Sequence, residues 1–190
     1  MTKQELAPIR EKIGTSVHIE ECEALYDLVG RIPHGNVVEV GSANGGSALY
    51  LAEASRLVGK KVFCVDPYPE SLENTKEENG WYGKGMCNSM YEKFKMHILQ
   101  KYEHVTHYRS SIPECYKQLP NELSVIFIDG RHDYPYPFID FIYLYPRLAV
   151  GGALAMHDSG FPGVFPVTAM FKTQCFKETW TVGSVTIGIK

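Results

Sequence analysis

The sequence lacks a long apolar run, a paired cysteine motif and an excess of basic residues. No stretch approaches the roughly 20 apolar residues of a membrane span, and the N-terminus lacks the apolar core of a secretory signal. Lys and Arg total 19 against 22 Asp and Glu, a net charge of −3, which argues against nucleic-acid binding. The five cysteines form no CxxC motif and indicate reduced thiols. We therefore expect a cytoplasmic protein with neither a membrane nor a nucleic acid as its partner.

Short β-branched runs alternate with helix-like apolar spacing along the 190 residues. This alternation predicts a single α/β domain, 1–190, with a Rossmann-like, doubly wound and mostly parallel sheet. A turn at Gly183 predicts a C-terminal hairpin that adds an antiparallel strand, and we expect seven strands in all. The expected strands are residues 36–40, 61–65, 104–109, 124–128, 152–156, 179–182 and 185–189.

Two segments lie outside this alternation. Residues 1–33 carry a helical apolar stripe from Cys22 to Ile32, which predicts an N-terminal helical cover over one sheet face. Residues 71–93 form a Gly-rich insertion with aromatic residues, which we interpret as a lid; an unstructured excursion is the alternative. The spacing of Met86, Met90 and Phe94 predicts a helix that anchors it.

Polar residues follow every expected parallel strand. Because ligands of open α/β sheets bind outside the carboxyl ends of the strands, these residues should converge on one rim. A turn or cap residue is the alternative for each of them taken alone. The segments are 41–47 after the first strand, then Asp66, then Ser110 and Ser111, then 129–134, and 157–159 after the fifth strand.

The first turn lacks the G-x-G-x-x-G pattern of dinucleotide-binding folds, since position 43 is Ala. Its glycines suit a ligand without a pyrophosphate, such as one with an amino-acid moiety. The carboxylate of that moiety would bind the helix N-terminus that begins near Gly46 and Ser47. Asp66, after the second strand, is placed to accept hydrogen bonds from ribose hydroxyls.

The chain resembles the class I S-adenosylmethionine-dependent methyltransferases, in the branch of small O-methyltransferases that act on sugars, macrolides and catechols. The motifs are VVEVGSANGGSALYLA, VFCVDPYPE and SVIFIDGRHDYPYPFIDFIYLYPRLAVGGALAMHD. The resemblance implies S-adenosylmethionine as cofactor, with Ser110 and Ser111 near its adenine. It places around the rest of the cofactor Glu39, Gly41, Ser42, Asn44, Gly45, Ser47, Asp66 and Asp129.

The same resemblance implies a divalent metal, with Mg²⁺ expected, held by Asp129 and Asp158 together with His157. Two carboxylates and a hard cation could bind an acceptor oxygen and lower its pKa. His132, three residues after Asp129, is the expected general base. The alternatives are that Asp129 caps a turn, that His157 is structural and that His132 only positions the substrate. Asp133 and Asp140 are expected to be solvated.

The predicted function is methyl transfer to a hydroxyl of a small molecule, such as a sugar or a natural product, with metal assistance. One alternative is a metal-independent N- or O-methyltransferase, and another is a catalytically silent nucleoside-binding module of the same fold. A dinucleotide-dependent oxidoreductase is disfavoured by the absent glycine pattern. The sequence leaves a homodimer open.

Overall fold

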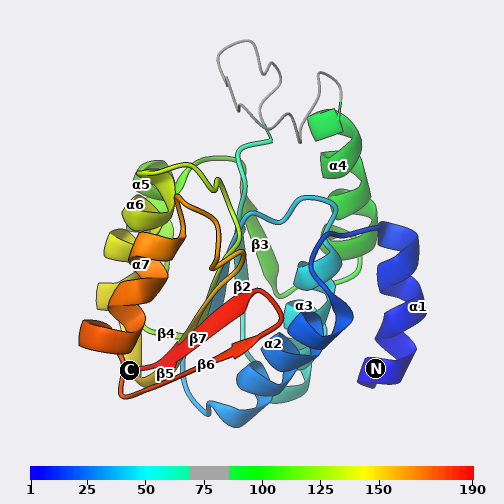
Figure 1. Ribbon diagram of the computed structural model, residues 1–190. Coiled ribbons are helices and arrows are strands. Elements are labelled where there is room, and N and C mark those ends of the chain that lie inside the picture. The colour runs from blue at the N-terminus through cyan, green and yellow to red at the C-terminus, as the bar shows by residue number, and fades with distance from the viewer. Residues whose placement is uncertain (69–85) are drawn as a thin grey trace.

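The computed structural model describes residues 1–68 and 86–190, and for residues 86 and 87 it describes only the backbone. Its centre is a seven-stranded sheet with the strand order β3-β2-β1-β4-β5-β7-β6 (Figure 1). The first five strands are parallel, and β7 runs antiparallel between β5 and β6. The predicted fold class is therefore confirmed. The strands are β1 (Asn36–Val40), β2 (Val62–Val65), β3 (Val105–Tyr108), β4 (Leu123–Ile128), β5 (Leu148–Met156), β6 (Glu178–Val182) and β7 (Val185–Ile189).

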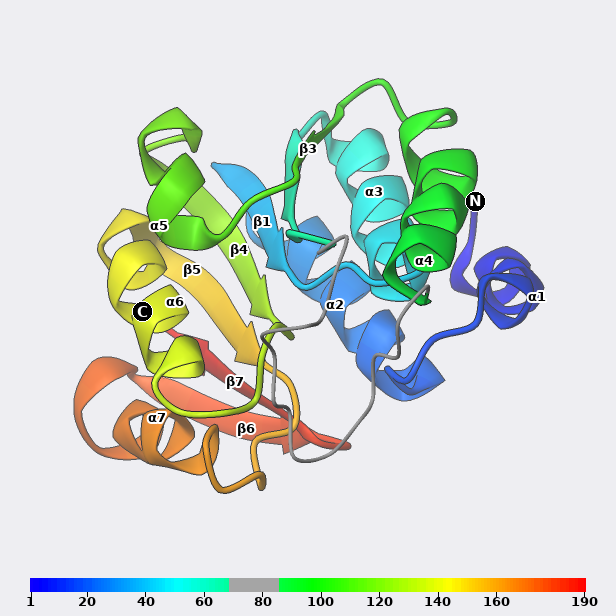
Figure 2. The ribbon, with the colours of Figure 1, turned by 90° about the horizontal axis from the view of Figure 1, so that it is seen from above.

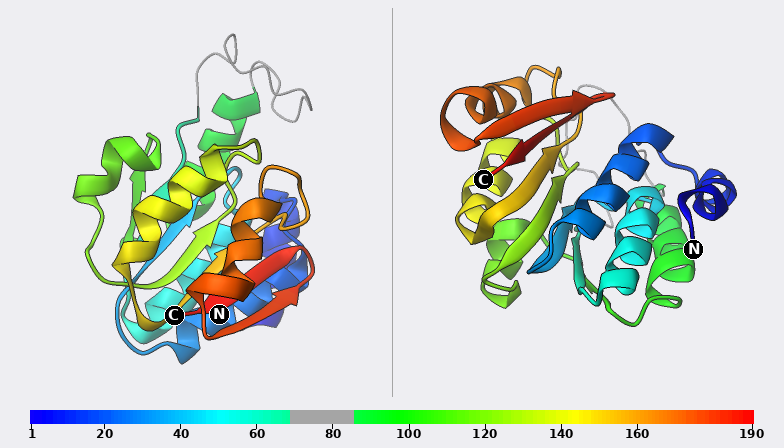
Figure 3. Two further views of the ribbon diagram at one scale, coloured as in Figure 1. Left: turned by 60° about the vertical axis from the view of Figure 1, so that its left-hand side comes forward. Right: turned by 90° about the horizontal axis from the view of Figure 1, so that it is seen from below.

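Helices cover both faces of the sheet (Figures 2 and 3). One face is covered by α2 (Ile19–Arg31), α3 (Gly46–Val58) and α4 (Met86–Phe94), which a π-helical turn, Lys95–Leu99, extends. Helix α1 (Lys3–Ile13) packs on the outside of α2 and α3 (Figure 2). The other face packs against α5 (Ile112–Cys115), α6 (Tyr136–Leu144) and α7 (Phe165–Met170). Further short helical turns are Tyr116–Gln118, Tyr145–Arg147 and Phe171–Cys175.

The central strands are buried on both faces because their side chains alternate between two apolar cores. Val37 packs into the core under α2 and α3, while its neighbour Val38 packs into the core under α6. Phe127 and Ile126 of β4 divide in the same way. Near-continuous apolar strands are typical of a parallel sheet covered on both sides, and they hold the strand ends rigidly at one rim.

Several element bounds differ from the sequence prediction. Strand β5 begins at Leu148, four residues before the predicted start, because it continues through Gly151 and Gly152. The anchoring helix is confirmed as α4, but residues 69–85, which hold most of the proposed lid, lie outside the described residues. Within the described ranges, no helix is long and apolar enough to cross a membrane.

Candidate active site

The carboxyl ends of β1 and β4 lie side by side at the point where the strand order reverses. Ligands of open α/β sheets bind in the crevice at such a switch point. The turn after β1 touches the end of β4 directly, because a Cβ atom on Gly41 would overlap the carbonyl oxygen of Asp129. Only a glycine fits there, with its φ of +82°.

The turn after β1 is held from beneath by Glu39, whose side chain is completely buried. Its carboxyl group accepts hydrogen bonds from Ser42 Oγ at 2.6 Å and Ser47 Oγ at 2.7 Å. Burial raises the pKa of Glu39 to about 7, against the lowering effect of these donors. The side chains of Glu39, Ser42 and Ser47 thus face one another, so the backbone of the turn is the part that a ligand can approach.

Asp66 joins this turn to the end of β2. Its Oδ2 accepts hydrogen bonds from the backbone N–H groups of Ser42 at 2.9 Å and Ala43 at 3.0 Å, and its Oδ1 accepts one from Tyr68 N–H at 3.0 Å. Burial raises the pKa of Asp66 despite these donors. The residue expected to bind ribose is therefore also the residue that shapes the turn.

Most of the remaining residues of the expected cofactor site make hydrogen bonds within the protein or cap a helix. Asn44 donates from Nδ2 to the carbonyl oxygen of Gly14 at 2.9 Å, and Gly45 caps α3 with a φ of +95°. Ser111 caps α5 and donates from Oγ to Glu114 at 2.7 Å. Ser110 differs, because its buried Oγ has no hydrogen-bond partner among the described residues. Ser111 is the exposed serine of the pair, and Ser110 is the one with an unpartnered hydroxyl.

Four side chains at the ends of β4 and β5 form one cluster: Asp129, His132, His157 and Asp158. One ligand atom from each lies within 4.8 Å of all the others. His157 Nδ1 lies 3.1 Å from Asp129 Oδ1 and 3.3 Å from Asp158 Oδ2. His132 Nε2 lies 3.5 Å from the first oxygen and 3.3 Å from the second. The structure thus brings together the predicted metal ligands and the predicted base.

The nitrogens of this cluster are close to carboxylate oxygens but poorly aligned with them. In the part of the chain that the structure describes, His132 Nε2 and His157 Nδ1 are buried and make no hydrogen bond of good geometry. Lone pairs of two carboxylates and two imidazoles can instead converge on a cation between them. The donor set therefore fits a divalent metal, and an imidazole nitrogen among the donors favours a first-row transition metal over Mg²⁺.

Charge in the cluster is unevenly distributed. Burial opposes protonation of His157, but the surrounding carboxylates outweigh it and raise the pKa of His157 to about 12. Burial likewise opposes protonation of His132, and Asp129 and Asp158 raise its pKa. The close approach of the His157 imidazole lowers the pKa of Asp158. Without a metal, His157 is thus a cation held by acidic groups.

Glu21 contacts the cluster through His157, on the side of the ring away from Asp129 and Asp158. The sequence alone did not predict this residue as part of the site. Its Oε2 lies 3.2 Å from His157 Nε2, across 136 residues of chain. Burial raises the pKa of Glu21, but its bonds with His157, Ser184 and His18 outweigh this and lower it to about 2. The only sequence signal was its place three residues after His18, the spacing of a helix capping box.

Backbone strain gathers at the same rim. Within the described ranges, three non-glycine residues have a left-handed φ: Ala43 at 44°, Tyr68 at 40° and Asp158 at 49°. They follow β1, β2 and β5 respectively. Such conformations cost about 1–3 kcal/mol each and cluster at functional sites. The strain supports placing the site where these three loops meet.

Asp140 corrects one expectation. It was expected to be solvated on a helix surface, but it is only 9% exposed, and burial raises its pKa to about 7. Its carboxyl faces Gly130 at the start of the loop after β4. Asp133 is exposed, as expected, and pairs with Arg131 at 2.7 Å.

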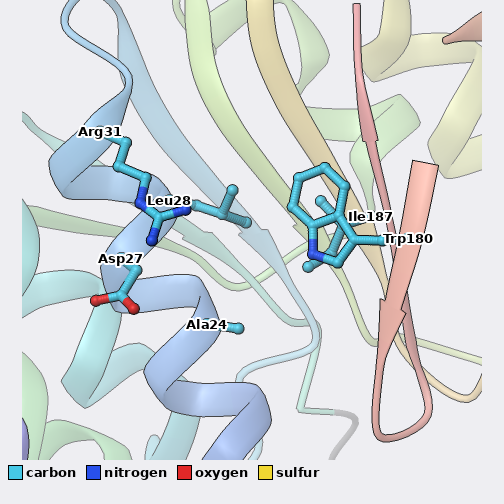
Figure 4. A pocket seen from close by; sticks show the side chains of 6 residues that line it. All are labelled: Ala24, Asp27, Leu28, Arg31, Trp180 and Ile187. Atoms are coloured by element: carbon cyan, nitrogen blue, oxygen red, sulfur yellow. The ribbon is translucent and has the colours of Figure 1, made fainter. Parts of the chain in front are cut away.

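A separate pocket lies between α2 and the β6–β7 hairpin. Its volume is about 190 Å³, and Leu28 extends toward Trp180 and Ile187 across it (Figure 4). Ligand pockets for drug-sized molecules are usually 300–1,000 Å³. Because Leu28 and Arg31 lie in the second half of α2, this pocket is distinct from the cluster beside Glu21, and we assign it no ligand.

Comparison with known proteins agrees with this geometry. The family model described as "Methyltransferase domain" matches residues 38–159, which include the turn after β1 and the whole β4–β5 cluster. No curated protein sequence matches the chain. The fold is similar to those of many solved structures.

Three of these structures illustrate the similarity. The O-methyltransferase TomG of Streptomyces achromogenes, involved in tomaymycin synthesis and solved with S-adenosylmethionine, is 14% identical with a TM-score of 0.66, over 98% of this chain and 88% of that one. CalS11, a TDP-rhamnose 3′-O-methyltransferase of calicheamicin biosynthesis, is 14% identical with a TM-score of 0.61, over 98% and 92%. An O-methyltransferase of Bacillus cereus bound to S-adenosylhomocysteine is 14% identical with a TM-score of 0.63, over 99% and 90%.

Proposed function

Because the chain belongs to the methyltransferase-domain family, we propose that it transfers a methyl group from S-adenosylmethionine to a hydroxyl group of a small molecule. The observation that carries this proposal is the contact between the turn after β1 and the acidic cluster. Gly41 abuts Asp129, and the N–H of Asp129 bonds to the carbonyl oxygen of Val40 at 2.8 Å. A cofactor seated on that turn would hold its methyl group beside two carboxylates and two imidazoles.

We assign the cofactor's amino-acid moiety to the start of α3 and its ribose to Asp66. The first N–H groups of a helix have no partner within it and attract a carboxylate. Ser110, with its unpartnered hydroxyl, and Ser111 would lie at the adenine. Glu39 acts on the cofactor through the turn, because its own side chain is fully buried.

We assign a divalent metal to Asp129, Asp158 and His157. When bound there, it would supply a Lewis acid that orients the acceptor oxygen and lowers its pKa. His132 stands at the edge of the cluster with its side chain 34% exposed, so it can receive the proton that the hydroxyl loses. Sugars and other polyhydroxylated natural products offer oxygens of the right kind, as does the sugar acceptor of CalS11.

A second candidate is metal-independent transfer, and the state of His157 favours it. With a pKa raised to about 12, His157 would itself be a cation among the carboxylates, and its positive charge would repel a metal ion. Asp129 and Asp158 would then hold His157 in place. A catalytically silent module would bind S-adenosylmethionine and transfer nothing.

Methyl transfer from labelled S-adenosylmethionine to a panel of nucleotide sugars, catechols and polyols tests the proposal. Metal-stripped protein should be inactive, and added Mn²⁺ or Mg²⁺ should restore turnover. Asp129→Asn and Asp158→Asn should require far more metal while their affinity for S-adenosylmethionine stays near that of the wild type. Activity that survives chelation would establish the metal-independent alternative, and cofactor binding without any product would establish the silent module.

A further inference from the structure

Glu21 lies at the base of the cluster and is 0% exposed, although its helix begins on the surface. Four donors surround its carboxylate. Oε1 accepts from Ser184 N–H at 2.6 Å and Ser184 Oγ at 3.0 Å, and Oε2 accepts from His18 N–H at 2.7 Å. The fourth partner is His157 Nε2, at 3.2 Å from Oε2.

These contacts decide which nitrogen of His157 would keep its proton when a metal binds the other. Both carboxylate oxygens already face backbone N–H groups, so Glu21 offers only lone pairs toward the imidazole. Nε2 must therefore be the donor. The other nitrogen, Nδ1, points into the space between Asp129 and Asp158 and makes no hydrogen bond of good geometry with a described residue.

We propose that Glu21 is a positioning residue that holds the proton of His157 on Nε2 and so presents Nδ1 as a ligand to the metal. The inference rests on the metal site of the proposed function and deepens it, since it names the atom that ligates. A metal-bound imidazole usually donates its other N–H to a carboxylate or a carbonyl, which fixes the orientation of the ring. The pair Glu21–His157 has that arrangement.

The turn of the β6–β7 hairpin (Figure 1) contacts Glu21 through Gly183 and Ser184. A Cβ atom on Gly183 would overlap the carboxylate of Glu21, and Gly183 has a φ of +56°. The turn therefore approaches Glu21 closely enough for Ser184 to donate twice to Oε1. The carboxylate is fixed by backbone groups on both sides, so it can orient the imidazole rather than follow it.

Metal affinity separates this role from a purely structural one. Calorimetric titration of metal-stripped protein with Mn²⁺ should show that Glu21→Gln weakens binding by about 10–100-fold, the usual effect of losing such a partner. Ser184→Ala is the matched control, because it removes one bond to Glu21 and leaves the bond to His157 intact. It should change Mn²⁺ affinity less than threefold, and both variants should keep their affinity for S-adenosylmethionine. Equal Mn²⁺ affinity in Glu21→Gln and Ser184→Ala would overturn the inference.

A second measurement needs no variant and holds even if Glu21→Gln fails to fold. The ¹⁵N NMR spectrum of the His157 ring, recorded with bound Zn²⁺, should show a protonated Nε2 and a metal-bound Nδ1. A metal-bound Nε2, or no change in the ring on Zn²⁺ binding, would refute the inference while the metal site stands. If the wild-type protein binds neither Mn²⁺ nor Zn²⁺, the metal site itself is wrong, and the inference falls with it.

Discussion

Asp66 Oδ2 accepts a hydrogen bond from the backbone N–H of Ser42 at 2.9 Å, which ties the end of β2 to the turn after β1. The same oxygen accepts from Ala43 N–H. One carboxylate therefore links the two loops that would surround the cofactor. A ligand that binds Asp66 would meet a turn that Asp66 has already shaped.

Asp66→Ala should weaken S-adenosylmethionine binding about ten- to a hundredfold. The variant removes an acceptor for the ribose and leaves buried N–H groups unpaired, at about 1–3 kcal/mol per lost partner. Calorimetry with S-adenosylhomocysteine measures the change. Asp27→Ala removes a carboxylate that is paired with Lys3 on α1 and should have no effect. Unchanged affinity in Asp66→Ala would place the ribose elsewhere.

Gly41→Ala should lower the free energy of unfolding by about 1–3 kcal/mol more than Gly151→Ala. Both glycines have a φ near +80°, so both substitutions introduce the same backbone strain. They differ in space, because a Cβ at Gly41 overlaps the backbone of Asp129, whereas nothing lies within 4 Å of one at Gly151. Urea denaturation of the two variants isolates the cost of that overlap. If the two variants lost the same free energy of unfolding, the turn after β1 would be able to move away from β4 without a cost in stability.

His132→Gln should slow methyl transfer by about 10²–10⁴-fold, the usual effect of losing a general base. Its Mn²⁺ affinity should stay within threefold of the wild type, because we assign ligation to Asp129, Asp158 and His157. Residual activity should rise with pH as the acceptor ionises without help. A parallel loss of Mn²⁺ affinity would instead make His132 a fourth ligand, which its 3.3 Å distance from Asp158 would explain.

Asp140 should make stability depend on pH. Its pKa rises from 3.8 to about 7 on burial, so the folded state holds a proton between these values that the unfolded state has lost. The contribution of Asp140 to stability therefore falls as the pH rises through that window. Asp140→Asn should match the wild type near pH 4 and exceed it by roughly 2–4 kcal/mol above pH 8.

Urea denaturation at several pH values measures this difference. Asp133→Asn removes an exposed carboxylate from the same region and controls for the change in net charge. A difference between Asp140→Asn and the wild type that stays constant from pH 4 to pH 8 would contradict the prediction.

The strand ends could be predicted from the sequence because their signals are local. A short apolar run followed by an acid, as at Asp66, Asp129 and Asp158, identifies both the strand and its rim. Parallel strands place their ends together, so the convergence of these three residues followed from the fold class alone. His132 followed from its spacing to Asp129.

The other residues depend on contacts that no local pattern encodes. Glu21 has the spacing of an ordinary helix cap, and its bond to His157 spans 136 residues. Asp140 lies in a helix so apolar that its one acid appeared to mark the solvated face, yet α6 is covered on that side by the loop at Gly130. Predicting either residue requires knowing which elements pack against its helix.

The two hydrogen bonds from Ser184 to Glu21 have a consequence for the folding of the chain during its synthesis. The two residues are 163 positions apart, so the ribosome adds the donors of Glu21 long after α2 has emerged. Until then the acidic residue at the base of the cluster has no backbone partner from the β6–β7 turn, and β5 remains the open edge of the sheet. The nascent chain should therefore form its parallel strands early. The cluster of acidic residues and histidines should be completed last, when the β6–β7 hairpin docks on β5.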